Sequence, residues 1–320
     1  MGAMTWAKAL FLTLAAACLV PIVPPWAALV AGTALALSLG NPFPKESKQY
    51  SKILLQVCVV LLGFSMDLNT VIKAGSQGIL FALVSISGVF LLGWGLQKAL
   101  KLRPVAGLLV STGTAICGGS AIAAMSTVVD ADQEDVSVSV GTVFILNAIA
   151  LLIFPPLGHA LGLNQHQFGT WAGIAIHDVA SVVGAGKAYG ADALEIATAV
   201  KLSRVLYLIP ITLVAAWYVN KSRQSQSGEE VAKSKAAFPW FILGFILASV
   251  LRSYVPQVAE ISPYAKMVAT AGLALALYLI GSGITRKTLK QVGVRPLVQG
   301  VALWAFISVA ALFAVYQLKP

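Results

Sequence analysis

The stretch STGTAICGGSAIAA, residues 111–124, lies inside a long apolar run and decides how the whole chain is interpreted. It carries glycine at 113, 118 and 119, a cysteine at 117 and hydroxyl side chains at 111, 112, 114 and 120, and none of its residues is charged. Glycines and small hydroxyl residues loosen a helix. A gap in a membrane helix is tolerated only where the freed backbone groups line a cavity or bind something.

The composition indicates that the surrounding chain is an integral membrane protein. Its 320 residues are 58% hydrophobic and only 11% charged, with a mean hydropathy of +0.85, whereas a soluble domain has about 25% charged residues. Charge-poor apolar runs recur along the chain, many of them near the ~20 residues that a transmembrane helix needs. They are continuous, whereas barrel strands are short and alternating. We therefore predict an all-α membrane protein forming a single polytopic domain over residues 1–320.

The apolar runs between helix breakers predict about 11 transmembrane helices. They are expected at roughly 5–20, 26–40, 52–66, 77–97, 104–129, 136–157, 168–188, 193–219, 238–254, 264–284 and 296–317. With the N-terminus inside and the C-terminus outside, most of the 22 basic residues fall on inner loops, as the positive-inside rule requires. The polar loop 220–238 is then cytoplasmic and divides the domain, and the acidic loop DADQED, residues 130–135, is expected outside.

Charge and motifs exclude several classes of function. The net charge is +10, but the lysines and arginines lie mostly between the apolar runs, so we expect no nucleic-acid partner. The three cysteines form no CxxC pair, and neither a Walker motif nor HExxH occurs. We therefore expect no cofactor, no metal site and no ATP-driven pump. An ion or substrate gradient is the expected source of energy.

Two distant segments resemble each other. LLGFSMDLNTVIKAG, residues 61–75, aligns without a gap with LIGSGITRKTLKQVG, residues 279–293, and the alignment matches two glycine pairs and one threonine pair. In the predicted topology the third crossing ends outside and the tenth ends inside. The match therefore predicts an inverted repeat, a feature of secondary transporters. The alternative is chance similarity between membrane segments that are both interrupted by glycine.

The first candidate site is the glycine-containing stretch itself. A break at Cys117, Gly118 and Gly119 would expose N–H groups at the start of a half-helix near Ser120, where the partial positive charge suits an anion. Thr112, Thr114 and Ser120 would add hydroxyl donors. The alternative is close helix packing by small residues, which needs no ligand, and this segment alone does not decide between the two.

A second unusual stretch is GIAIHDVASVVGAGKAYG, residues 173–190, in the seventh crossing. His177 and Asp178 lie near its middle, followed by Ser181. Ionisable residues at this depth are costly and usually functional. Adjacent residues point about 100° apart on a helix, so one would face a ligand path while the other fixes a neighbouring helix. The alternative is a buried structural hydrogen bond.

The eighth crossing contains AVKLSRVLYLIP, residues 199–210. Lys201 and Arg204 are three residues apart and therefore share a helix face. There they would attract an anion or pair with Asp178; the alternative is that both extend to the membrane interface. Asn147 in the sixth crossing is a further polar candidate, which we expect to be structural.

At these residues the chain resembles the YeiH-like sulfate exporter family. The resemblance rests on TAICGGSAIAA (114–124), GIAIHDVASVVGAG (173–186) and ATAVKLSRV (197–205), in that order, and the general layout is similar over most of the chain. Many members have His-Glu in place of His177-Asp178 and glutamine in place of Ser181, which leaves the role of this carboxylate open.

The resemblance implies export of sulfate, sulfite or a similar small oxyanion across the bacterial cytoplasmic (inner) membrane. It also implies kinship with the sodium/proton antiporter and bile-acid symporter folds, in which broken helices cross at the membrane centre. Such a fold would place the break at 114–120 at a substrate site.

Together these features predict a secondary transporter of a small anion and not an enzyme. Lys201 and Arg204 would supply positive charge. His177 would couple transport to protons, and sodium is the other expected coupling ion. Asp178 would orient His177 or pair with Arg204. The alternatives are a cation/proton antiporter that uses Asp178 as ion ligand, an anion channel, and an intramembrane enzyme that uses His177, Asp178 and Cys117. Dimers are common among such transporters, and we expect a homodimer.

Overall fold

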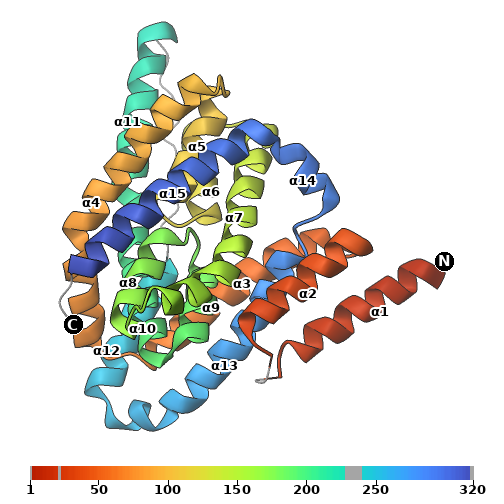
Figure 1. Cartoon of the computed structure of the whole chain (residues 1–320), viewed down its shortest axis with the longest axis vertical. Helices are drawn as coiled ribbons and strands as arrows, with labels where there is room; N and C mark the ends of the chain where they lie inside the picture. Colours follow the sequence, from red (N-terminus) through yellow and green to blue (C-terminus); the bar gives the residue numbers. More distant parts are fainter. Residues whose placement is uncertain (1, 21–22, 228–239, 318–320) are drawn as a thin grey trace.

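The computed structural model describes residues 2–20, 23–227 and 240–317, and within these residues it is entirely helical (Figure 1). It has fifteen helices in that part of the chain: α1 (Gly2–Ala17), α2 (Pro25–Ser38), α3 (Pro44–Gly63), α4 (Leu68–Ala99), α5 (Pro104–Ala115), α6 (Gly119–Val128), α7 (Gln133–Ala160), α8 (Gln165–Ala175), α9 (Val179–Tyr189), α10 (Ala191–Leu206), α11 (Leu208–Ser227), α12 (Trp240–Tyr254), α13 (Pro256–Gly281), α14 (Arg286–Val292) and α15 (Val294–Gln317). The predicted all-α class is confirmed.

Length and composition separate the helices that can cross a bilayer alone from the shorter ones. Among the residues that the structure describes, five segments are long and apolar enough: Phe81–Ala99, Gln133–Ala160, Ala191–Lys221, Glu260–Gly281 and Val294–Gln317. The helices α2, α3, α5 and α13 begin with proline in the first turn, where its missing N–H removes no helical hydrogen bond. Part of the predicted loop 220–238 is helical, because α11 extends to Ser227, and the rest of it lies outside the described residues.

One group of helices consists of α2, α3, α12 and α13, with α1 against its outer side (Figure 1). The helices α3 and α13 both end at a glycine, Gly63 and Gly281, and a four-residue link follows each of them. A Cβ atom on Gly63 would lie 2.5 Å from the carbonyl oxygen of Phe245 in α12, and one on Gly281 would lie 2.4 Å from that of Leu29 in α2. Both glycines are therefore required by a close helix crossing.

The two segments of the internal repeat run in opposite directions. Asn41, just before α3, donates to the carbonyl of Ser282, just after α13, at 3.1 Å. At the other end of the pair, the N–H of Leu68 at the start of α4 donates to the hydroxyl of Ser253 in α12 at 2.8 Å. The antiparallel arrangement agrees with the predicted inverted repeat; the side chain of Thr70, part of the match, lies outside the described residues.

The second group contains α4 to α10 and α15, and here the structure corrects the predicted topology. The α5–α6 segment is a hairpin, which we call the first hairpin. If its 12 and 10 residues were stacked end to end, its ends would lie about 30 Å apart. Instead Arg103, before α5, forms ion pairs with Asp132 at 2.6 Å and Glu134 at 3.0 Å, after α6. The predicted crossing 104–129 is wrong, because the segment returns to the side from which it enters.

The α8–α9 segment forms a second hairpin in the same way. Gln165, at the start of α8, accepts a hydrogen bond at 2.9 Å from the N–H of Asp192, which follows α9. Tyr189 at the end of α9 stacks on Phe168 with ring centroids 3.7 Å apart and donates to the carbonyl of Leu163. The predicted crossing 168–188 is therefore wrong as well.

Two of the eleven predicted crossings, 104–129 and 168–188, are thus hairpins that do not cross, so nine of the predicted crossings remain. Loop 130–135 lies on the same side as Arg103, so its predicted placement opposite the basic loop 98–103 is wrong. The two hairpins enter from opposite sides, since α7 runs from one to the other through a span of 28 residues.

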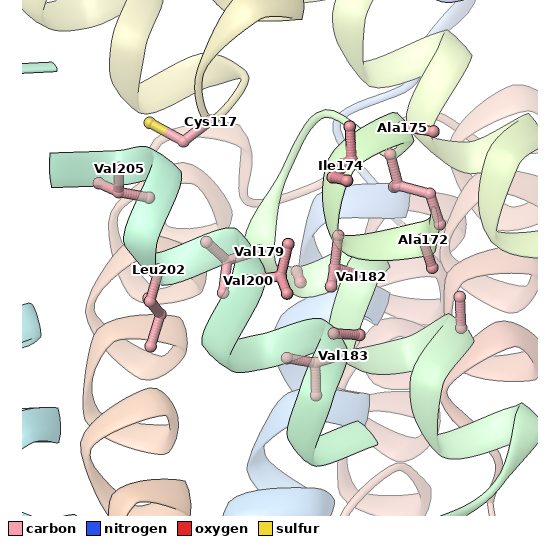
Figure 2. Close-up of a cluster of buried hydrophobic side chains, with 14 of the residues drawn as sticks. Cys117, Ala172, Ile174, Ala175, Val179, Val182, Val183, Val200, Leu202 and Val205 are labelled. Carbon is pink, nitrogen blue, oxygen red and sulfur yellow. The ribbon is translucent and has the colours of Figure 1, made fainter. Parts of the chain in front are cut away.

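Small residues let the second hairpin pack closely on α10. A Cβ atom on Gly169 or Gly173 of α8 would lie 2.9 or 2.8 Å from a backbone carbonyl of α10. The surrounding cluster is apolar and includes Val182 and Val183 of α9 and Val200 of α10 (Figure 2). This packing fixes the face of α10 that carries Lys201 and Arg204.

Candidate functional site

The tips of the two hairpins meet inside the second group of helices. The first tip is residues 116–118 and the second is residues 176–178. Gly118 has φ +71° and ψ −131°, and a Cβ atom there would lie 3.1 Å from Cβ of Asp178. Only glycine adopts this backbone conformation without strain and leaves room for the opposite tip. The predicted break is thus present, and a second break faces it.

Two buried cations on α10 bind the carbonyl end of α5. Arg204 donates from Nη2 to the carbonyl of Ala115 at 2.5 Å and from Nη1 to the hydroxyl of Ser85 in α4 at 2.9 Å. Nζ of Lys201 lies 3.5 Å from the carbonyl of Ile116. These carbonyls carry the partial negative charge of a helix C-terminus, which a cation stabilises. Lys201 is 0% and Arg204 1% exposed, so neither extends to the membrane interface.

The helices that leave the two tips differ at their N-termini. In α9, the carboxylate of Asp178 accepts hydrogen bonds from the N–H of Ser181 at 2.6 Å and from its hydroxyl at 3.2 Å. In α6, the N-cap is Gly118, which offers no side chain, so the N–H groups of Gly119 and Ser120 have no capping partner. The α6 end therefore presents bare donors and partial positive charge, whereas the α9 end is already neutralised.

Cys117 and Ser120 complete the first tip. The Cys117 sulfur and the Ser120 hydroxyl are 3.0 Å apart, and the same hydroxyl donates to the Cys117 carbonyl at 3.2 Å. Cys117 is buried and has a free thiol (Figure 2). The Ser120 side chain is thus held over the start of α6, where it can turn its hydroxyl toward a bound group.

The second tip is extended and not helical at His177 and Asp178, which corrects the prediction that the two lie on one helix about 100° apart. Asn147 on α7 holds this tip, because its side-chain oxygen accepts from the N–H of His177 at 3.1 Å and from that of Asp178 at 3.3 Å. The predicted structural role of Asn147 agrees with this geometry. The alternative that Asp178 pairs with Arg204 is wrong, because the carboxylate caps α9 and the guanidinium binds α4 and α5.

Several buried polar atoms around the tips have no hydrogen-bond partner in the described part of the chain. They are the Thr114 hydroxyl, the side-chain nitrogen of Asn147, both ring nitrogens of His177 and Nε of Arg204. A buried polar atom left unpaired costs about 1–3 kcal/mol. This many in one place indicates a site that is completed by a ligand, by water or by both.

The structure therefore places the ten predicted site residues at the two facing tips, on the helix turns next to these tips, and on one face of α10. Ser181 contributes through the Asp178 cap and not as a free donor. Sequence reasoning missed Ser85, and it missed a second repeat with an offset of 60 residues, in which Gly-Thr-Ala-Ile-Cys at 113–117 matches Gly-Ile-Ala-Ile-His at 173–177. That match was the available signal that the two segments form equivalent hairpins.

The arrangement is suited to binding an anion rather than a metal ion. No group of three or more His, Cys, Asp or Glu side chains that could hold a metal occurs among the residues described by the structure. Two cations, one helix N-terminus and one carboxylate that is already hydrogen-bonded surround the tips, so positive charge predominates.

Comparison with known proteins identifies relatives over nearly the whole chain. The profile of the family described as "Conserved hypothetical protein 698" matches residues 8–300. UPF0324 membrane protein Bd1437 of Bdellovibrio bacteriovorus is 42% identical, with 97% of this chain and 94% of the relative covered. A UPF0324 membrane protein of Bacteroides thetaiotaomicron is 44% identical (92% and 87% covered), and GSU2818 of Geobacter sulfurreducens is 44% identical (95% and 94% covered). No solved structure matches.

Proposed function

The chain belongs to the Conserved hypothetical protein 698 family, the family of the UPF0324 membrane proteins, and we propose that this multi-pass membrane protein is a secondary transporter of a small oxyanion. The observation that carries the proposal is the uncapped start of α6, which directly follows a tip bound by two buried cations and accompanied by buried polar atoms without a hydrogen-bond partner in the described part of the chain. An oxyanion at the tips would accept hydrogen bonds from the N–H groups of Gly119 and Ser120 and from Thr114. It would also offset the charges of Lys201 and Arg204.

The hairpins suggest transport rather than catalysis. Each tip reaches the site from a different side of the membrane, so movement of either hairpin would open the site to one side only, as alternating access requires. Two of the three groups that an intramembrane enzyme would use are already engaged, because Asp178 caps α9 and Cys117 lies against Ser120. The positive-inside distribution supports an N-terminus inside, and a homodimer remains our expectation for the oligomeric state.

We propose protons as the coupling ion. His177 is fully buried, and the charged groups that act on it are Lys201 and Arg204 on α10. A proton on His177 would add a third positive charge to this dry site, and a bound dianion would offset it. Anion binding and proton uptake should therefore reinforce each other, as linkage requires.

Sulfate or sulfite is the substrate suggested by the resemblance to YeiH-like sulfate exporters. Both are small oxyanions of the size that two helix ends and a few hydroxyls can surround. Export from the cell across the cytoplasmic membrane is part of the same proposal. The geometry supports small oxyanions as a substrate class, and the choice of sulfate or sulfite comes from the resemblance.

A thermal-shift screen of the purified protein tests the proposal, since a ligand of the folded state raises the apparent melting temperature. Sulfate, sulfite, phosphate, nitrate and sodium chloride are compared at pH 6, 7 and 8, at constant ionic strength. A saturable shift with one or more oxyanions, larger at pH 6, is expected. A shift with sodium alone would favour the cation/proton antiporter with Asp178 as ligand, and unitary currents in bilayers would favour the channel.

A further inference from the structure

A cavity of about 450 Å³ lies far from the hairpin tips, between the two groups of helices. Its walls are the end of α9, the first turn of α10 and one face of α13, and its lining residues are Lys187, Gly190, Ala191, Leu194, Pro263, Lys266, Met267 and Thr270. The four residues from α13 follow the spacing i, i+3, i+4, i+7, so they form a single helix face. The cavity lies at the end of the molecule from which the second hairpin enters.

Two cations converge on this cavity. The ammonium group of Lys187 forms no ion pair or hydrogen bond within the described ranges, and the charged group that acts on it is a second cation, Lys266. Lys266 is only loosely neutralised, with Nζ 3.6 Å from the carboxylate of Glu195. An anion placed between the lysines would relieve their repulsion.

Several of the other lining residues are apolar. Leu194, Pro263 and Met267 supply hydrocarbon walls beside the two ammonium groups. Tyr254 at the end of α12 is 72% exposed and Tyr264 on α13 is 67% exposed. Exposed tyrosines near helix ends mark the level of lipid headgroups. The cavity therefore combines positive charge and hydrocarbon surface at the depth where a phospholipid presents a phosphate and the start of its acyl chains.

We propose that this cavity binds the phosphate group of an anionic phospholipid, with Lys187 and Lys266 on the phosphate and Leu194 and Met267 along the first acyl carbons. The lipid would connect the α8–α10 part of the molecule with α13. The site is separate from the hairpin tips and does not depend on the proposed function. Inorganic phosphate has the same phosphate chemistry but no acyl chains. Comparing it with a phospholipid therefore distinguishes a lipid-binding site from a site for soluble anions.

The test measures lipid binding to the delipidated full-length protein in detergent, without sulfate. Native mass spectrometry and thermal shift are recorded with phosphatidylglycerol, with phosphatidylcholine and with inorganic phosphate. Each lysine near an anionic headgroup contributes about five-fold in affinity, so we expect about thirty-fold preference for phosphatidylglycerol over phosphatidylcholine. Inorganic phosphate at equal concentration is expected to give no shift.

Variants assign the effect to the cavity. Lys187→Gln with Lys266→Gln should remove the preference, and Lys187→Gln alone, at an exposed position without an ion pair, should lower it to about six-fold. The control, Lys98→Gln with Lys221→Gln, makes the same charge change at the opposite end of the molecule and should keep the preference. Equal binding of both lipids, an unchanged preference in the double variant, or a shift with inorganic phosphate that equals the lipid shift would overturn the proposal.

Discussion

Replacing the hydroxyl of Thr114 by a methyl group separates a ligand-binding role from a structural one. In the protein without ligand, this buried hydroxyl has no hydrogen-bond partner, although it lies one residue before the carbonyl that Arg204 binds. A purely structural threonine would be expected to use its hydroxyl, as Thr112 does on the same helix, where it donates to the carbonyl of Leu108 at 2.8 Å. We therefore expect Thr114→Val to lose ligand affinity without losing stability.

The magnitudes follow from the cost of unpaired groups. A buried polar atom without a partner costs about 1–3 kcal/mol, so its replacement by a methyl group of similar shape should leave the free energy of unfolding unchanged or raise it by about 1 kcal/mol. A hydrogen bond to a charged ligand contributes about 1.5–3 kcal/mol. Its loss corresponds to a dissociation constant about 10- to 100-fold larger.

The assay is isothermal titration with sulfate, together with the melting temperature of the protein without ligand. Thr112→Val is the matched control, since it makes the same chemical change two residues away. It should cost about 1 kcal/mol of stability and keep the affinity of the unmodified protein. Unchanged affinity in Thr114→Val, or an equal loss in Thr112→Val, would refute the assignment of Thr114 to the ligand.

Substitutions at three further positions probe the two tips and the α10 face that binds the first tip. Gly118→Ala should abolish anion binding and cost about 1–3 kcal/mol in a thermal melt, because the backbone conformation is strained for alanine and Asp178 is too close, whereas Gly40→Ala, also at positive φ but with open space around it, should leave binding intact. Arg204→Ala should abolish binding, and Arg204→Lys should weaken it about ten-fold, since lysine keeps the charge but cannot span both partners; unchanged sulfate affinity in Arg204→Ala contradicts its role. His177→Gln should give sulfate affinities that are equal at pH 6 and pH 8, and a persisting pH dependence would assign the proton to another group.

Much of the fold follows from the sequence alone. Continuous apolar runs locate α1, α2, α7, α12 and α15 to within a few residues, whereas α3, α4 and α13 begin several residues before the predicted runs. The match between 61–75 and 279–293 predicts two antiparallel segments of similar form. Glycine predicts the break at residues 116–118 because no other residue adopts its backbone conformation without strain. These features are local, so a single sequence contains them.

The direction taken after the break is not local, and it could not be predicted in the same way. A kinked crossing and a hairpin can have the same apolar composition, so composition does not distinguish them. The first hairpin is identified by the ion pairing of Arg103 with residues beyond α6, and the second by the close packing of α8 against α10. For the same reason the sequence left open whether Asp178 pairs with Arg204 or orients His177. Each of the Asp178 and Arg204 side chains instead binds the helix end nearest to it, because the partial charges of that helix end stabilise the side chain more than a distant opposite charge would.

The most direct test of the two-hairpin arrangement is the side of the membrane on which the ends of each hairpin lie. Ala99→Cys and Gln133→Cys flank the first hairpin, and His166→Cys and Ala191→Cys flank the second; the native cysteines are all buried. An impermeant maleimide is applied to sealed vesicles of defined orientation. The account predicts that residues 99 and 133 react from one side and residues 166 and 191 from the other. Labelling of 99 and 133 from opposite sides would contradict it.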